Sequence, residues 1–263
     1  MELGLGGRVA IVGGSSRGLG RAIAVELAQE GVDLIMCARG GADLEETAAV
    51  ISAKSPARIV TVVADTSQAE GVRAVMDAAN GEFGHVDILV TNSGGPPAGK
   101  FETHDAAAWQ AAYASLLGSV TSLVREAMPG MKERGWGRII NVTSIAVKQP
   151  VDDLILSNSL RAGVTGFAKT LSNEVAKFGI TVNNVMPGYT RTDRLEQLAA
   201  RVAKAKGVPE SEMLTVWNDE IPAGRIGEPS ELAGLVAFLA SDRAAYITGQ
   251  SIAVDGGWIR SLL

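Results

Sequence analysis

The fold is decided by the stretch VAIVGGSSRGLG, residues 9–20, in which an apolar run leads directly into a glycine-rich turn. After the turn, Leu19, Ile23 and Leu27 recur at every fourth position, which is typical of a helix with one buried stripe. Glycines let a backbone turn sharply and approach an anion, and the N–H groups at a helix start attract phosphate. The stretch therefore predicts a strand, a turn and a helix that bind a phosphate group, with a merely tight connection as the alternative.

The same alternation continues along the chain. Short unbroken apolar runs indicate strands that are covered on both faces, as in a parallel sheet, and longer Ala-rich helical patterns separate them. Repeated β-α-β units predict an α/β protein with a doubly wound parallel sheet of about seven strands and helices on both faces. The expected strands are 9–12, 34–37, 59–63, 88–90, 139–142, 181–185 and 252–254, and the expected helices are 18–30, 43–54, 68–83, 105–134, 158–178 and 229–240.

The alternation of strands and helices runs along the chain without a break that would mark a domain boundary. We find no linker, low-complexity tract or internal repeat, so we expect a single dinucleotide-binding domain over residues 1–263. One segment, about residues 189–225, is more polar and departs from the alternation. We expect it to form a substrate lid within the domain, because long excursions at strand ends are often functional.

Composition excludes several classes of protein. The 263 residues carry a formal net charge of −5 and include two histidines and one cysteine, which argues against nucleic-acid binding, a metal site and a disulfide scaffold. Cys37 has no possible partner within the chain, which fits a reducing compartment. The N-terminus lacks the features of a signal peptide, and no apolar stretch approaches the roughly 20 residues of a membrane helix. We therefore expect a cytoplasmic protein without a membrane segment.

Residues at the ends of the predicted strands fit a dinucleotide. Arg39 stands where an acidic residue would bind the free ribose 2′-hydroxyl of NAD, and its guanidinium suits a 2′-phosphate instead, with Arg17 as a second candidate. The sequence thus favours NADP over NAD, the alternative being two solvated arginines. Asp65 is placed to accept from an adenine amino group or to cap a helix. Asn92 is placed to contact the ligand, to tie two strands together, or both.

Several motifs, in the same order, resemble the short-chain dehydrogenase/reductase family, in particular its β-ketoacyl-acyl-carrier-protein (ACP) reductase-like members. They cover essentially the whole chain: residues 14–20, NSG at 92–94, GRIINVTS at 137–144, PGYTRT at 187–192, ITGQ at 247–250 and VDGG at 254–257. The resemblance implies a Rossmann-type fold and an NAD(P)(H)-dependent, NADP-preferring oxidoreductase that acts on a small carbonyl or alcohol substrate. It also implies a homotetramer or homodimer, with the helices near 105–134 and 158–178 and the C-terminal strand at the interfaces.

The resemblance further implies which residues bind the cofactor. These are Gly14, Ser16, Arg17, Gly18, Leu19, Arg39, Asp65, Thr66, Asn92, Gly94, Arg161, Pro187, Gly188, Thr190 and Thr192.

The catalytic part departs from the family pattern. Ser144 matches the family's serine, but the positions of its Tyr-x-x-x-Lys pair hold Ser157 and Arg161. The family's helix asparagine aligns with Ser115, so three of the four catalytic positions are replaced. The resemblance therefore implies an atypical active site made of Ser144, Ser157, Arg161 and Ser115.

These replacements change the expected proton chemistry. A tyrosine, with an unperturbed pKa near 10, is acidified by a neighbouring cation and exchanges a proton with the substrate oxygen. A serine hydroxyl is far harder to ionise, and an arginine keeps its positive charge but does not give up a proton. Alcohol–ketone exchange should be slow unless another group supplies the proton. The candidates are Asp152, Asp153, Tyr113 and Tyr189, whereas His85 and His104 are expected at the surface.

Three functions follow from these observations. The first is an NADP(H)-dependent oxidoreductase with an altered proton relay, acting on a carbonyl, an imine or an activated double bond. The second is a nucleotide-binding protein without redox turnover, serving as a sensor or a structural subunit. The third is a non-redox lyase or dehydratase that keeps the fold, because a fold alone does not fix the chemistry.

Overall fold

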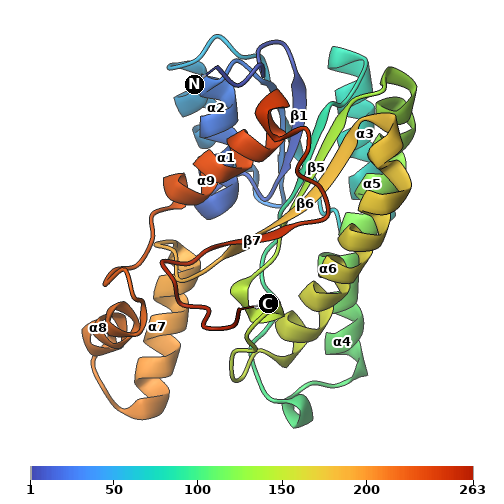
Figure 1. Cartoon of the computed structure of the whole chain (residues 1–263). Helices are drawn as coiled ribbons and strands as arrows, with labels where there is room; N and C mark the ends of the chain where they lie inside the picture. The colour runs from blue at the N-terminus through green and yellow to red at the C-terminus, as the bar shows by residue number, and fades with distance from the viewer. Residues whose placement is uncertain (1, 263) are drawn as a thin grey trace.

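A computed structural model describes residues 2–262 and contains one seven-stranded sheet (Figure 1). All strand pairs are parallel, in the order β3-β2-β1-β4-β5-β6-β7, so the predicted doubly wound α/β class is confirmed. The order reverses between β1 and β4, which is where open sheets of this kind bind ligands. The strands are β1 (Val9–Gly13), β2 (Asp33–Ala38), β3 (Ile59–Val63), β4 (Ile88–Thr91), β5 (Gly137–Val142), β6 (Ile180–Pro187) and β7 (Ser251–Val254).

Helices cover both faces of the sheet, which explains the unbroken apolar strands. Along β1, the side chains of Ala10 and Val12 enter one core, whereas that of Ile11 enters the other. The first core is closed by α1 (Gly18–Gln29), α2 (Gly41–Ser52) and α9 (Pro229–Ala240), and the second by α3 (Ala69–Phe83), α5 (Ser119–Arg134) and α6 (Ile155–Val175) (Figure 1). The edge strand β3 is a partial exception, since Val63 is 60% exposed there.

The continuous helix expected over residues 105–134 is interrupted. The structure has α4 (Ala106–Tyr113), a π-helical turn (Ala114–Gly118) and then α5. Asp105 caps the start of α4 by accepting a hydrogen bond from the N–H of Ala108 at 2.8 Å. The apolar pattern does not reveal the π-helical turn, because such a turn widens the helix without ending it.

The segment expected to form a lid, about residues 189–225, is largely helical. It contains α7 (Asp193–Lys206) and α8 (Glu210–Glu220), which lie apart from the sheet between β6 and α9 (Figure 1). The two helices share an apolar cluster of their own that includes Trp217. Because this cluster is small, each helix needs only a short apolar stripe, and the surrounding polar residues hide it from sequence analysis. Among residues 2–262, the structure has no helix with the length and apolar character needed to cross a membrane.

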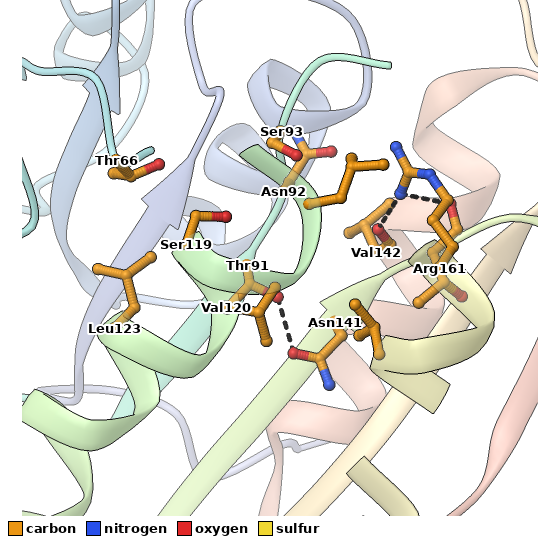
Figure 2. A pocket seen from close by; sticks show the side chains of 13 residues that line it. Thr66, Thr91, Asn92, Ser93, Ser119, Val120, Leu123, Asn141, Val142 and Arg161 are labelled. Atoms are coloured by element: carbon orange, nitrogen blue, oxygen red, sulfur yellow. Dashed lines mark hydrogen bonds between the residues drawn. The ribbon is translucent and has the colours of Figure 1, made fainter. Parts of the chain in front are cut away.

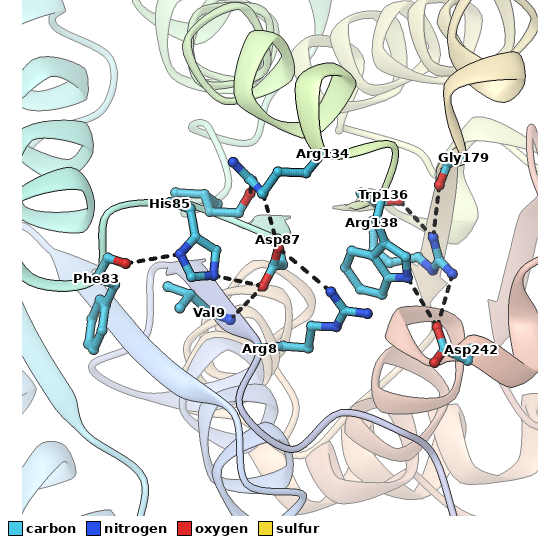
Figure 3. A network of polar contacts seen from close by, with 12 residues as sticks. Arg8, Val9, Phe83, His85, Asp87, Arg134, Trp136, Arg138, Gly179 and Asp242 are labelled. Carbon is cyan, nitrogen blue, oxygen red and sulfur yellow. Dashed lines mark hydrogen bonds and ion pairs between the residues drawn. The ribbon is translucent and has the colours of Figure 1, made fainter.

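A buried carboxylate fastens the amino-terminal edge of the sheet (Figure 3). Asp87, which is 3% exposed, accepts a hydrogen bond from the N–H of Val9 at 3.2 Å and contacts Nε2 of His85 at 3.2 Å. Arg134 and Arg8 approach its other oxygen at 3.6 and 3.9 Å. His85 is therefore half-buried and engaged with Asp87, rather than a free surface residue as expected.

A change of Asp87→Asn tests this network. The amide still accepts the Val9 N–H but removes the charge that two arginines face, so we expect the free energy of unfolding to fall by about 1–3 kcal/mol. Urea denaturation measures the loss, with Asp77→Asn on the exposed side of α3 as the matched control. Equal stability of the two variants would show that the carboxylate charge does not matter.

Candidate functional site

The glycine turn between β1 and α1 forms a tightly folded backbone cradle without side chains at its glycine positions. Gly14 and Gly18 have φ values of +58° and +56°, a conformation that favours glycine. A Cβ atom on Gly20 would lie 2.1 Å from the carbonyl oxygen of Gly14, so a side chain there would collide with the turn. The start of α1 is thereby left bare for a phosphate group, as the sequence predicts.

The remaining residues predicted in this turn, Ser16, Leu19 and Arg17, have different surroundings. The carbonyl of Ser16 accepts a hydrogen bond from Oγ1 of Thr47 at 2.9 Å. Leu19 packs against the core on the α1 side of the sheet. The guanidinium of Arg17 is exposed and lies 3.7 Å from Asp193 of α7.

Asn92 joins the two strands at which the sheet order reverses. Its Nδ2 donates a hydrogen bond to the carbonyl of Gly13 at 3.1 Å, so the strand-tying role is present. A Cβ atom on Gly13 would lie 2.6 Å from the carbonyl oxygen of Asn92. The backbones of β1 and β4 therefore approach each other closely at their carboxyl ends.

Arg39 and Asp65 lie at the outer end of the same edge. Nη2 of Arg39 lies 4.0 Å from the position that a Cβ on Gly94 would occupy, so Arg39 spans from the end of β2 toward the segment after β4. Asp65 accepts a hydrogen bond from the N–H of Ser67 at 3.0 Å. Partial burial opposes ionisation of Asp65, but the bonds from Ser67 and the charge of Arg39 together lower its pKa. This edge thus combines an exposed guanidinium with an ionised carboxylate.

The three residues expected at the reacting end come from β5 and α6. Ser144 lies two residues after the buried end of β5, and its Oγ accepts a hydrogen bond from the N–H of Ala146 at 3.1 Å. Ser157 and Arg161 lie on one face of α6 and are each 9% exposed. Arg161 reaches back to β5, since its Nη1 donates to the carbonyl oxygens of Val142 at 2.8 Å and Thr143 at 3.0 Å (Figure 2). The fold therefore brings Arg161 to the strand end that leads into Ser144.

Ser115 lies within the π-helical turn between α4 and α5. Its hydroxyl donates to the carbonyl of Ala112 at 3.3 Å, and its own carbonyl accepts a hydrogen bond from Oγ of Ser119 at 2.6 Å. The side chain that replaces the family's asparagine is therefore engaged with its own helix.

A small cavity of about 10 Å³, room for about one water molecule, lies between this turn and the sheet (Figure 2). Thr66, Asn92, Ser119 and Arg161 are among the residues that line it. Below it, Thr91 donates to Oδ1 of Asn141 at 2.7 Å, and Nδ2 of Asn141 donates to Oδ1 of Asn184 at 2.9 Å. These bonds connect β4, β5 and β6 through their side chains beneath the cavity.

The loop after β6 completes the cleft. The N–H of Gly188 donates to the carbonyl of Val254 in β7 at 3.0 Å, which seats the turn after Pro187 against the C-terminal strand. Thr190 is buried, and Thr192 caps α7 through the N–H of Leu195 at 3.3 Å. The methyl group of Thr192 lies 3.4 Å from the position of a Cβ on Gly18, so this loop faces the glycine turn.

Of the two candidate tyrosines, Tyr189 packs against the apolar cluster of α7 and α8, and Tyr113 is exposed on α4. The ring of Tyr189 stacks on Trp217 with a centroid distance of 4.9 Å and meets Trp258 edge-on at 5.9 Å. Burial, reinforced by the charge of Glu220, raises the pKa of Tyr189 to about 12, so its phenol stays protonated at neutral pH. Tyr113 is 46% exposed on α4.

Asp152 and Asp153, the other candidate proton donors, lie in a turn before α6. Asp152 and Asp153 are exposed, and Asp153 has a φ of 57° in a turn whose carbonyl accepts the N–H of Gly99 at 2.6 Å. His104 is half-buried, contrary to the expected surface position, and its Nε2 is buried without a hydrogen-bond partner among residues 2–262.

Sequence reasoning missed one cation at this site, Arg194. Its Nη2 donates to the carbonyl of Pro96 at 3.0 Å, and its guanidinium lies 2.8 Å from the position of a Cβ on Gly95. Burial and then the charge of Arg201 lower its pKa, and its own charge contributes to the lowered pKa of Arg161. The signal was present, because Arg194 follows the PGYTRT motif at two residues' distance.

Comparisons with known proteins agree with this geometry. A family model described as enoyl-(acyl carrier protein) reductase matches residues 14–259. The 3-oxoacyl-[acyl-carrier-protein] reductase FabG of Vibrio cholerae is 37% identical over 255 residues, covering 97% of this chain and 98% of that protein. The NADPH-dependent reductase BacG of Bacillus subtilis is 31% identical, covering 97% and 99%. The crystal structure of L-sorbose reductase from Gluconobacter frateurii, complexed with NADPH and L-sorbose, has a TM-score of 0.95 at 36% identity, covering both chains completely.

The role of Arg39 is open to a direct test. Replacing Arg39→Asp removes a cation from the end of β2, so we expect NADPH to bind about thirtyfold more weakly, the equivalent of about 2 kcal/mol of charge-assisted hydrogen bonding. NADH binding should be unchanged or improved. Fluorescence titration measures both, and Arg73→Asp on the exposed side of α3 controls for the change in net charge. Unaltered NADPH affinity would assign the 2′-phosphate to another group.

Proposed function

The chain belongs to the short-chain dehydrogenase/reductase family, as its motifs predict, and from this premise we propose that it is an NADP-preferring reductase of carbonyl compounds with an atypical active site. The observation that carries the proposal is the bare cradle at Gly14, Gly18 and Gly20 together with Arg161 at the end of β5. The first is suited to a nucleotide, and the second brings a positive charge to the reacting end.

The residues present fit NADP. The glycines keep side chains away from the start of α1, so the pyrophosphate would lie against the N–H groups there. Arg39 would hold the 2′-phosphate and Asp65 the adenine amino group. Asn92 and Gly94, with Thr190 and Thr192 across the cleft, would line the nicotinamide half. We extend this assignment to the other predicted cofactor residues, including Ser16, Leu19, Thr66, Pro187 and Gly188.

Bound NADPH would supply the hydride for reduction. The chain's own part is to polarise the carbonyl group, and the hydroxyls of Ser144 and Ser157 are free to donate toward a substrate oxygen. Arg161 would stabilise the negative charge that develops on that oxygen, because a fixed cation in a water-poor site needs no reorganisation as the charge appears. A guanidinium does not release its proton at neutral pH, so the proton would come from water.

We retain two further predictions about the assembled protein. The segment near 189–225, with α7 and α8, would act as a substrate lid over the domain 1–263. The chain would form a homotetramer or homodimer. Phe101 and Tyr113, which are 66% and 46% exposed beside an open hollow of about 600 Å³ at α4, support a subunit contact there.

Turnover tests the proposal. The protein mixed with NADPH and a panel of ketones and aldehydes should lose the absorbance of reduced nicotinamide. Ser144→Ala should lower kcat/KM about 10²-fold by removing one donor to the developing oxyanion. Ser159→Ala, an exposed serine on the same helix as Ser157, is the matched control. NADPH binding without consumption of any substrate would support the alternative of a nucleotide-binding protein without redox chemistry.

The altered proton chemistry predicts the pH profile. Burial, with a contribution from Arg194, lowers the pKa of Arg161 to about 10, and the pKa of Tyr189 is about 12. Both groups stay protonated as pH rises from about 6 to about 9, so kcat at saturating NADPH should change less than about twofold over this range. Stopped-flow rates in a constant-ionic-strength buffer measure the profile. A transition inside the range would reveal a titrating side chain, and Asp152→Asn or Asp153→Asn would locate it.

A further inference from the structure

The segment after β7, residues 255–260, is fixed by its own hydrogen bonds. The carboxylate of Asp255 accepts the N–H of Gly257 at 2.9 Å and the N–H of Ile259 at 2.8 Å. Gly256 and Gly257 have φ values of +62° and +88°, so the chain turns sharply directly after the strand. We call this segment the strap, because it runs from β7 between the lid helices α7 and α8 and the loop before α6 (Figure 1).

One side of the strap holds the lid helices. The N–H of Ala223, just after α8, donates to the carbonyl of Gly256 at 3.0 Å. The ring of Trp258 packs on the apolar cluster shared by α7 and α8, where it meets Tyr189 edge-on at 5.9 Å. Tyr189 in turn stacks on Trp217 of α8. A displacement of α8 therefore displaces Trp258 as well.

The far end of the strap is bonded to the loop that carries Ser144. The N–H of Arg260 donates to Oε1 of Gln149 at 3.1 Å, across 111 positions of the chain. Gln149 closes the short turn that Ser144 begins, since its N–H donates to the carbonyl of Ile145 at 3.1 Å and Ser144 caps the same turn. The position of Gln149 therefore affects the direction of the Ser144 hydroxyl.

The strap lies at a distance from the predicted phosphate sites. It begins at β7, an edge strand of the sheet, and β4, β5 and β6 separate β7 from β1. The glycine turn follows β1, and Arg39 follows β2. The strap therefore belongs to the part of the site where the substrate, rather than the phosphates of the nucleotide, is expected.

We propose that the strap holds the lid helices and the Ser144 turn in one arrangement, so that the Ser144 hydroxyl points at the substrate oxygen only when α7 and α8 are seated. Gln149 and Trp258 act through other groups and are positioning residues at its two ends. The inference rests on the proposed function, in which Ser144 donates toward the developing oxyanion. The position of such a donor matters, because a displacement of about 1 Å lowers a rate by up to about 10²-fold.

Releasing one end of the strap tests the inference through turnover. Gln149→Ala deletes the acceptor for the Arg260 N–H, so we expect kcat to fall about tenfold while the affinity for NADPH changes by less than about twofold. Gln149→Glu keeps an oxygen at that position and should restore most of kcat. Lys148→Ala, at an exposed neighbouring residue, is the matched control. Equal losses in Gln149→Ala and Gln149→Glu, or a loss in neither, would overturn the strap.

Releasing both ends tests the coupling. Trp258→Ala frees the strap from the lid helices and should also lower kcat, whereas Trp258→Phe keeps an aromatic ring there. If the strap works as one unit, the double variant Gln149→Ala/Trp258→Ala loses no more kcat than the more impaired single variant. Losses that multiply would show that the two ends act independently, which contradicts the coupling.

Hydrogen exchange separates this inference from the proposed function, because it needs no substrate. The amides of Val147, Lys148 and Gln149 are bonded within the Ser144 turn. In the NADP⁺-saturated protein, Trp258→Ala should speed their exchange at least about fivefold, with exchange in β3 unchanged. Faster exchange without reduction of any carbonyl compound would contradict the proposed function and support the strap. Unchanged exchange in an active enzyme would overturn the strap and leave the reductase intact.

Discussion

The hydrogen bond from Nδ2 of Asn92 to the carbonyl of Gly13 lies between the two strands at which the sheet changes direction. At that point the chain has built outward from β1 to β3 and must return to add β4 on the other side. The backbones meet so closely that Gly13 has no space for a side chain. The cradle, the ends of β4 and β5, and the facing loop after β6 all take their positions from this junction. A small displacement here would therefore alter the whole cleft.

The fold could be predicted because each strand is sandwiched between two apolar layers. Ala10 and Val12 pack into one core and Ile11 into the other, so every residue of the strand has to be apolar. Such unbroken apolar runs are easy to recognise in a sequence. The helices α7 and α8 were missed for the opposite reason. They pack chiefly on each other around Trp217, and a two-helix cluster requires few apolar residues. His85 was expected at the surface because the sequence does not show that Asp87, two residues away, is buried. Asp87 is buried partly by Arg8, which is distant in the sequence, and it holds His85 in place.

In the candidate site, too, some residues could be predicted from the sequence and others could not. Glycines in a turn and serines after a strand leave recognisable patterns, because the backbone geometry demands them. Arg194 follows the PGYTRT motif by two residues, but its position depends on how α7 packs and on its hydrogen bond to the carbonyl of Pro96. The significance of Arg161 was also only half visible. Its identity was plain in the sequence, but the hydrogen bonds from its Nη1 to the carbonyls of Val142 and Thr143 depend on the folded chain.

The π-helical turn at Ala114–Gly118 sets how α4 is rotated relative to α5. Each residue of a helix advances the side-chain direction by about 100°, so the wider turn changes the direction in which everything before it points. The faces of α4 and α5 are thereby set independently. α5 keeps its apolar side on the sheet, while α4 directs Trp109 and Tyr113 to an open hollow at the molecular surface. Removing one residue from this turn would rotate α4 and leave α5 in place against the sheet. Changes in α4 therefore need not disturb the core.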